Sequence, residues 1–163
     1  MPTRYLGPKR ETRALDTFIK LLRATDSVYD RLQSGLTEAG ITHAQLAVLE
    51  ALWHLGPMCQ RELGQKLLRS GANTTAVVDT LEKRGWVART RRADDRRVYQ
   101  VALTASGKRF IQTIFPAHAR RVADALSVLG SAEQEQLGRL CKKLGLALSG
   151  RASTHSDKPK PRG

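Results

Sequence analysis

Cysteine is scarce in this chain, which has two among 163 residues, Cys59 and Cys141. Two thiols so far apart do not make the disulfide framework of a small secreted domain, so we expect both to be reduced and structural. Cys141 lies beside an apolar stripe, which predicts a buried side chain. A redox role for Cys59 is the alternative, because a helix expected to begin there would lower the pKa of its thiol.

Long apolar runs are also missing, and no stretch approaches the roughly 20 residues that cross a membrane. The first residues, MPTRYLGPKRETR, are polar and basic and lack the apolar centre of a signal peptide. We therefore expect a cytoplasmic protein without a membrane partner.

Motifs of the common enzyme classes are absent from the sequence. It has no GxSxG, P-loop or dinucleotide-binding fingerprint, and its one candidate carboxylate pair, Asp94 and Asp95, lies on an expected turn. The four histidines do not stand at metal-ligand spacing with Cys or carboxylates. We expect neither an enzyme nor a metal site, and no cofactor apart from a small-molecule effector.

Acidic residues are few, and the resulting net charge of +13 is unevenly distributed. Residues 61–109 carry a net charge of +7, whereas residues 11–60 carry −2. Residues 1–10 and 151–163 add +3 each. A basic segment on a near-neutral remainder favours a polyanionic partner, double-stranded DNA first. A protein-interaction module that never meets nucleic acid is the alternative that this charge argues against.

Apolar residues at alternating spacings of three and four indicate long helices at both ends of the chain. The two stripes consist of Leu15, Phe18, Leu22, Tyr29, Leu32 and Leu36, and of Leu137, Leu140, Leu144 and Leu148. Such stripes pack against another helix. We favour the helices of a second copy of the chain, and packing within one chain is the alternative.

Capping residues and glycines divide the middle of the chain into short elements. Two capping-box patterns, Thr42 to Gln45 and Ser131 to Gln134, predict helix starts. A short helix is expected over 60–68 and another from Ser70 to about residue 84. Strands are expected over 86–92 and 98–103, with Tyr99, Val101 and Leu103 on one face. A long helix should follow Thr104, interrupted or kinked near Pro116.

This order of elements predicts a mainly α fold with a small β-hairpin wing, that is, a winged helix-turn-helix flanked by long dimerisation helices. The expected segments are a flexible basic arm (1–10), a dimerisation helix (11–40), the DNA-binding region (41–104), further dimerisation helices (105–150) and a disordered basic tail (151–163).

The expected wing concentrates five arginines within residues 89–97. A hairpin tip projects outward, so arginines on it can enter a DNA minor groove or lie along phosphates. We predict DNA contacts from Arg92, Arg96 and Arg97. Asp95, two residues before Arg97, can hold that guanidinium by a forked hydrogen bond and orient it.

The helix from Ser70 is the candidate reader of bases. Thr74, Val77, Val78 and Leu81 should face inward, which leaves Gly71, Asn73, Thr75 and Ala76 facing outward. Asn can make two hydrogen bonds to adenine, and the methyl groups of Thr and Ala can contact the thymine methyl. Arg69 and Ser70 can meet phosphates at the helix start.

Three motifs then make a resemblance specific: Leu81-Glu82-x-x-Gly85, Asp95-Arg96-Arg97 and Leu103-Thr104-x-x-Gly107. Over about residues 12–148 the chain resembles the MarR family of bacterial transcriptional regulators. The resemblance implies a homodimer built from the first and last helices, a reading helix in the major groove and a wing in the minor groove. It also implies that Asp95 orients Arg97, and that DNA is released when a ligand or an oxidant acts.

The stretches SGANTTAVVDTLEKRGWV and IFPAH resemble a branch of that family with repressors that respond to quinone-like compounds. Ala76 departs from many relatives, which have Arg there, and this leaves the base preference open.

An effector pocket is expected between the dimer helices and the reading module. Trp53 and His54 are predicted to line it, with Tyr29 and Arg23 opposite. An aromatic ring beside polar groups suits a phenolic or quinone-like effector. Core packing of Trp53 and surface exposure of His54 are the alternative.

We therefore expect a sequence-specific regulator, a ligand-released repressor that binds a palindromic operator as a homodimer. A sequence-neutral architectural protein of the chromosome is the alternative, since the expected reading face is small and uncharged.

Overall fold

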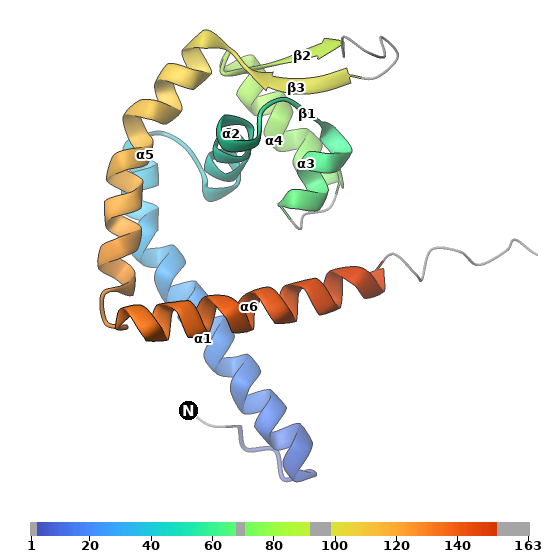
Figure 1. Ribbon diagram of the computed structural model, residues 1–163, viewed down its shortest axis with the longest axis vertical. Coiled ribbons are helices and arrows are strands. Elements are labelled where there is room, and N and C mark those ends of the chain that lie inside the picture. The colour runs from blue at the N-terminus through green and yellow to red at the C-terminus, as the bar shows by residue number, and fades with distance from the viewer. Residues whose placement is uncertain (1–2, 68–70, 92–98, 153–163) are drawn as a thin grey trace, which may run out of the picture. The chain divides into compact units, whose positions relative to one another are not determined.

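The computed structural model of the protein describes residues 3–67, 71–91 and 99–152. It divides into two compact units, Met1–Ala125 and Leu126–Gly163. The elements in chain order are α1 (Lys9–Glu38), α2 (His43–Leu55), β1 (Met58–Cys59), α3 (Gln60–Lys66), α4 (Gly71–Lys83), β2 (Val87–Arg91), β3 (Tyr99–Leu103), α5 (Ala105–Leu126) and α6 (Ser131–Ala152) (Figure 1). The predicted fold class, mainly helical with a hairpin wing, is confirmed.

Helix α1 begins inside the segment predicted as an arm. The Thr3 amide donates to Asp16 Oδ1 at 2.6 Å, and the Tyr5 hydroxyl donates to Glu11 Oε2 at 2.8 Å, so residues before the helix lie against its first turns. Of this 30-residue helix only Leu32, Gly35 and Leu36 are buried. The C-terminal end of α1 therefore packs on the core, while the rest of its apolar stripe stays exposed within one chain.

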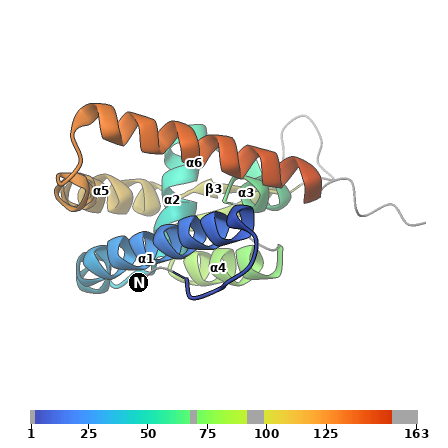
Figure 2. The same cartoon turned by 90° about the horizontal axis from the view of Figure 1, so that it is seen from below.

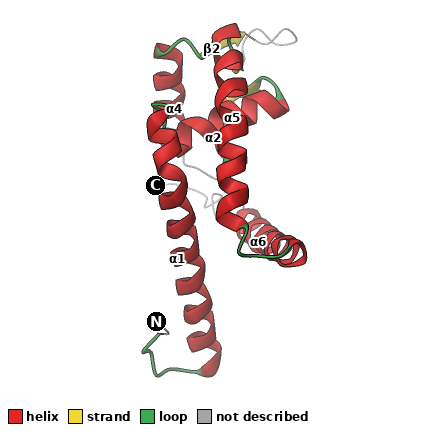
Figure 3. Cartoon of the chain, turned by 90° about the vertical axis from the view of Figure 1, so that its left-hand side faces the viewer, coloured by secondary structure: helices red, strands yellow, loops and turns green. Residues whose placement is uncertain are grey.

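The core of the first unit lies between α2, α3, α4 and the sheet. Its fully buried side chains include Leu49 of α2, Leu63 of α3, Leu81 of α4 and Ile111 of α5. Figure 2 shows α3 and α4 on the same side of α5, and Figure 3 shows α1 and α5 as neighbouring columns. Burial of several large aliphatic side chains, each contributing about 1.5–3 kcal/mol, stabilises this arrangement.

The sheet has three antiparallel strands in the order β1-β3-β2. The hairpin was predicted, but β1 was not, because a two-residue strand is too short to show alternation. Met58 pairs with Val101 and is buried beside it. The expected common face of β3 is only partly correct, because Val101 is buried whereas Tyr99, at the outer end of the hairpin, is 54% exposed.

Helix starts follow local capping chemistry. The box at Thr42 is confirmed, since its hydroxyl accepts from the Gln45 amide and the Gln45 side chain accepts from the Thr42 amide. Helix α3 has the same arrangement between Cys59 and Glu62, which was not predicted because Cys is an uncommon N-cap.

Helix α5 runs without a break through Pro116, so the predicted interruption is wrong. Proline removes one amide donor and leaves the carbonyl four residues earlier unpaired. Pro116 and Gln112 are both exposed, and water can therefore satisfy that carbonyl.

Helix α6 belongs to the second unit and begins one residue away from the predicted box. The amide of Gly130 donates to Glu133 Oε2 at 2.8 Å, which makes Glu133 the acidic partner of the cap. The Gln134 side chain instead donates to the carbonyls of Leu126 and Leu129. Cys141 is exposed, so the prediction that it is buried is wrong. The apolar stripe beside it is exposed within one chain as well.

Candidate functional site

Helix α4 presents two different faces. Thr74, Val78 and Leu81 are buried, as predicted, with Thr74 only 1% exposed. Asn73 and Ala76 are exposed on the other face. Gly71 is the first residue of the helix, whereas Arg69 and Ser70 lie outside the described residues. The helix therefore offers small and amide side chains to a partner along its first two turns.

Arg89, in the middle of β2, joins the hairpin to α4. Its Nη2 contacts Asp79 Oδ1 and its Nη1 contacts Glu82 Oε2, while its backbone amide donates to Glu82 Oε1 at 3.1 Å. The hydrogen bond that Arg89 donates to Asp79 is the largest cause of the raised pKa of Arg89. The Arg89 side chain is 26% exposed and its guanidinium is bonded within the protein, so it differs from arginines that extend into solvent.

Gln60, the first residue of α3, connects Arg89 to the first turns of α4. Its Oε1 accepts from Arg89 Nη2 at 3.4 Å, and its Nε2 donates to Thr75 Oγ1. Thr75 is consequently half-buried and bonded within the protein, which differs from the outward orientation expected for it. The sequence showed no sign of this contact, because the three residues come from different elements.

The outer part of the wing is only partly described. The Arg91 guanidinium carbon lies 5.3 Å from the centre of the Tyr99 ring, and both side chains are exposed. Arg92, Asp95, Arg96 and Arg97, the predicted minor-groove residues, lie outside the described residues. Their DNA contacts remain predictions.

The motif residues around the hairpin have clear structural roles. Gly85 has φ +69°, a left-handed conformation that ends α4 and favours glycine. Thr104 Oγ1 accepts from the Gly107 amide at 3.0 Å and donates to the Gly85 carbonyl at 2.6 Å. A Cβ on Gly107 would lie 1.9 Å from the Trp86 carbonyl oxygen, so only glycine fits at this approach of α5 to the hairpin.

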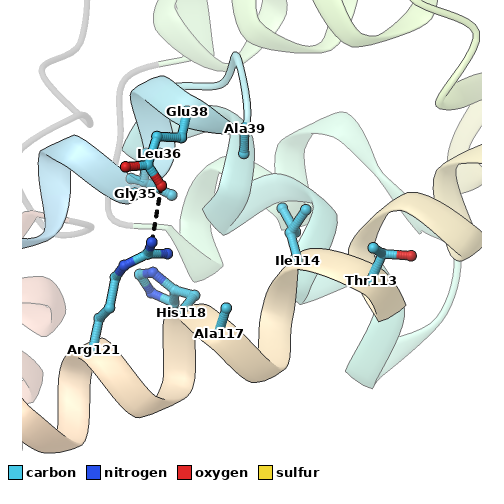
Figure 4. A pocket seen from close by; sticks show the side chains of 9 residues that line it. All are labelled: Gly35, Leu36, Glu38, Ala39, Thr113, Ile114, Ala117, His118 and Arg121. Carbon is cyan, nitrogen blue, oxygen red and sulfur yellow. Dashed lines mark hydrogen bonds and ion pairs between the residues drawn. The ribbon is translucent and has the colours of Figure 1, made fainter.

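Two cavities lie between the helices beside this module, and His118 of α5 borders both. The first, of about 250 Å³, lies between the C-terminal end of α1 and α5, with Glu38, Ile114 and Arg121 in its lining (Figure 4). The second, of about 210 Å³, lies between α1 and α2 and is lined by Tyr29 and Glu50. Both combine apolar walls with a few polar groups, as small-molecule sites do.

Charged groups are placed at the cavity walls. Arg121 Nη2 lies 2.9 Å from Glu38 Oε2, and the two side chains point toward each other across the first cavity (Figure 4). Burial lowers the pKa of His118, and nearby Glu50 opposes this by raising it. Because both members of the Arg121–Glu38 pair are exposed by 40% or more, the pair is weak and an incoming anion can displace Glu38.

Of the predicted pocket residues, only Tyr29 lines either cavity. Trp53 and His54 do not, because both pack against Phe115, with ring centres 5.2 Å and 5.6 Å from it. Arg23 is exposed on α1, six residues before Tyr29. Sequence reasoning missed His118 and Arg121, although their spacing of three on a helix was a signal that they share a face.

Two absences hold for the described part of the chain. No three side chains of His, Cys, Asp or Glu there come together as ligands for a metal ion. Over the same ranges, no helix combines the length and apolar character that crossing a membrane requires.

Comparison with known proteins identifies the family. The sequence model of the MarR family matches residues 41–99. The chain is 36% identical to the uncharacterised HTH-type transcriptional regulator YkoM of Bacillus subtilis, over 82% of this chain and 87% of that protein. It is 34% identical to the HTH-type transcriptional regulator MhqR of the same organism, over 82% of this chain and 92% of that one.

Solved structures agree with this fold. A probable transcriptional regulator from Pseudomonas aeruginosa superposes with a TM-score of 0.70 at 31% identity, covering 77% of this chain and 94% of that one. Sco3205 of Streptomyces coelicolor, solved in complex with DNA, gives 0.76 at 24%, covering 90% and 91%. Bordetella bronchiseptica BpsR, whose DNA binding is regulated by 6-hydroxynicotinic acid, gives 0.72 at 23%, covering 79% and 98%. The motifs, the winged helix-turn-helix and these relatives together show that the chain belongs to the MarR family of transcriptional regulators, which are not enzymes.

Proposed function

We propose that the protein is a homodimeric repressor that binds a palindromic operator in the bacterial cytoplasm and is released by a small aromatic effector. The observation that carries the proposal is the two-faced helix α4. Its inner face is locked in the core, and its exposed first turns lie in the same module as the β2–β3 hairpin. This arrangement suits insertion of α4 into a major groove and of the wing into the adjoining minor groove.

Base reading is assigned to the start of α4 and to the wing tip. Asn73 and Ala76 are exposed where they can meet an adenine edge and a thymine methyl. Arg92, Arg96 and Arg97 would contact phosphates and the minor groove, with Asp95 orienting Arg97. Arg69, Ser70 and Gly71 would hold the phosphates at the start of the helix.

Dimer formation is supported by apolar side chains that stay exposed within one chain. On α1, Phe18 is 55% and Leu22 46% exposed, and on α6, Leu140 is 57% and Leu144 49% exposed. These residues recur at helical spacing, so they form faces rather than isolated apolar contacts with water. A second copy of the chain is the occupant that would cover both faces and give a two-fold protein for a two-fold operator.

The effector site is assigned to the two cavities around His118. Arg121 can bind a carboxylate or phenolate in place of Glu38, and Ile114 and Leu36 offer apolar contact to a ring. The regulation of BpsR by 6-hydroxynicotinic acid, a hydroxylated aromatic acid, supports this class of effector.

The test is selection of duplexes from a randomised DNA pool by the purified protein, followed by titration of the recovered duplex against a scrambled one. A two-fold symmetric consensus supports the operator proposal, and a pool that stays random contradicts it. Addition of 6-hydroxynicotinic acid or salicylate should then weaken binding of the recovered duplex. Arg121→Ala should lose that response while retaining affinity for DNA, and an unchanged response would contradict the pocket assignment.

A further inference from the structure

We propose that Asp79 and Glu82, two carboxylates on the reading helix, promote operator binding because they position α4 through Arg89, and that Gln60 extends this positioning to Thr75. The inference rests on the proposed function, in which α4 reads the operator. These four residues and Thr75 would then act as a positioning unit. None of them needs to bond the DNA directly.

Helix α4 carries two carboxylates, which is unexpected for a helix that binds DNA. A helix that approaches a phosphate backbone gains from Lys and Arg, and a carboxylate on it repels phosphate. Asp79 and Glu82 are three residues apart, so they lie on one face of the helix. Both are bonded to the guanidinium of Arg89, which compensates part of their negative charge.

The geometry of the cluster fixes the angle between α4 and the hairpin. A guanidinium is planar and rigid, and here its two outer nitrogens hold two different carboxylates. The Arg89 amide adds a third bond, to Glu82 Oε1 at 3.1 Å. Arg89 pairs with Val101 of the central strand, so the position of α4 is tied to the whole sheet.

Gln60 carries this constraint to the exposed part of α4. It comes from α3, and its one amide group contacts both Arg89 and Thr75. Thr75 lies in the sequence between Asn73 and Ala76, which are both exposed on the first turns. The bond from Gln60 to Thr75 therefore holds the first turns of α4 in place before DNA arrives, which lowers the entropy lost on binding.

The decisive variant is Asp79→Asn, because a charge effect and a positioning effect predict opposite changes in its affinity for the operator. If Asp79 acted only as a negative charge near DNA, its neutralisation would raise the affinity for every duplex. If it positions α4, the affinity for the selected operator should fall about tenfold while that for a scrambled duplex stays equal or rises. Asp124→Asn on α5 is the matched control and should leave the ratio of the two affinities unchanged.

Thr75 gives a second and milder test. Thr75→Val keeps the shape but cannot bond Gln60, whereas Thr75→Ser keeps the hydroxyl. We expect the ratio of operator to scrambled affinity to fall several-fold in the valine variant and to be restored in the serine variant. Thermal unfolding of each variant establishes that it is folded at the assay temperature. If Asp79→Asn is unfolded, Thr75→Val tests the proposal in its place.

The outcomes separate the two proposals. A wild-type protein that does not discriminate between duplexes overturns the proposed function and this inference with it. A wild type that discriminates, together with an Asp79→Asn variant that binds the operator equally or more tightly, overturns the positioning role alone. Loss of discrimination in Asp79→Asn and Thr75→Val, but not in Thr75→Ser and Asp124→Asn, supports it.

Discussion

Side chains of one type take different roles within the short segment 89–97. Arg89 is bonded to two carboxylates of α4, and Arg91 lies over an exposed tyrosine ring. Arg97, by its position in the wing motif, is the residue that we expect in the minor groove. Arg97→Ala should therefore weaken operator binding by about 1–3 kcal/mol with the fold intact. Titration of the selected operator, with thermal unfolding as the control for folding, measures this effect. Near-normal affinity would contradict the wing assignment, and Asp95→Ala should give a smaller loss.

His118 connects the pocket to the pH dependence of stability. Burial lowers its pKa below 6.5, so the unfolded chain takes up a proton at a higher pH than the folded chain does. The contribution of neutral His118 to the free energy of unfolding is complete above pH 6.5 and is lost as the pH falls below it. Urea unfolding at about pH 7.5 and about pH 5.5 should show a larger loss of stability for the wild type than for His118→Gln. Equal losses in the two proteins would contradict a half-buried, neutral His118.

At the scale of elements, the start of α5 depends on one glycine. In Gly107→Ala the new Cβ would meet the Trp86 carbonyl, and either the hairpin or α5 must shift. We expect a loss of about 1–3 kcal/mol in the free energy of unfolding, as for overpacked sites. The matched control is Gly138→Ala in α6, where a Cβ meets nothing within 4 Å. That variant should gain about 0.5–1 kcal/mol from helix propensity. A fully stable Gly107→Ala would show that the two elements are not packed closely.

The starts and ends of several helices could be predicted from the sequence. Starts at Thr42 and Thr104 and the stop at Gly85 depend on neighbouring residues only, so the sequence predicted them. The cap at Cys59 was missed because Cys is an uncommon N-cap. The start of α6 was predicted to within one residue, although Glu133 bonds the Gly130 amide in place of the expected Ser131–Gln134 box. Apart from the two-residue strand β1, the order of elements was correct, because periodicity and turn residues repeat along the chain.

The site was less predictable, because its contacts join distant residues. Glu82 and Thr104 were recognised as parts of motifs, but their bonds to Arg89 and Gly85 follow only from the packed structure. Trp53 was expected to line a pocket opposite Tyr29, whereas Trp53 and His54 pack against Phe115 of α5. No local sequence pattern indicates whether Trp53 packs near Tyr29 or against Phe115.

At the scale of the whole molecule, the exposed faces of α1 and α6 make dimer formation the central structural expectation. Leu22→Glu or Leu144→Glu would place a charge in an apolar interface, where an unpaired carboxylate is strongly unfavourable. Sedimentation equilibrium should show a shift toward monomer and an accompanying loss of operator affinity. Lys20→Glu, on an exposed position of α1 outside the stripe, is the control and should remain dimeric. Unchanged dimers in both leucine variants would exclude these faces as the interface.

Competition between the selected duplex and a scrambled duplex at two salt concentrations distinguishes a sequence-specific repressor from a protein that binds any DNA. We expect a two-fold symmetric site with half-sites about 10 bp apart. It should bind at least about a thousandfold more tightly than the scrambled duplex, with affinity for both falling steeply as salt rises. Equal affinity for the two duplexes would contradict a sequence-specific repressor and would instead indicate an architectural protein that binds the chromosome without regard to sequence.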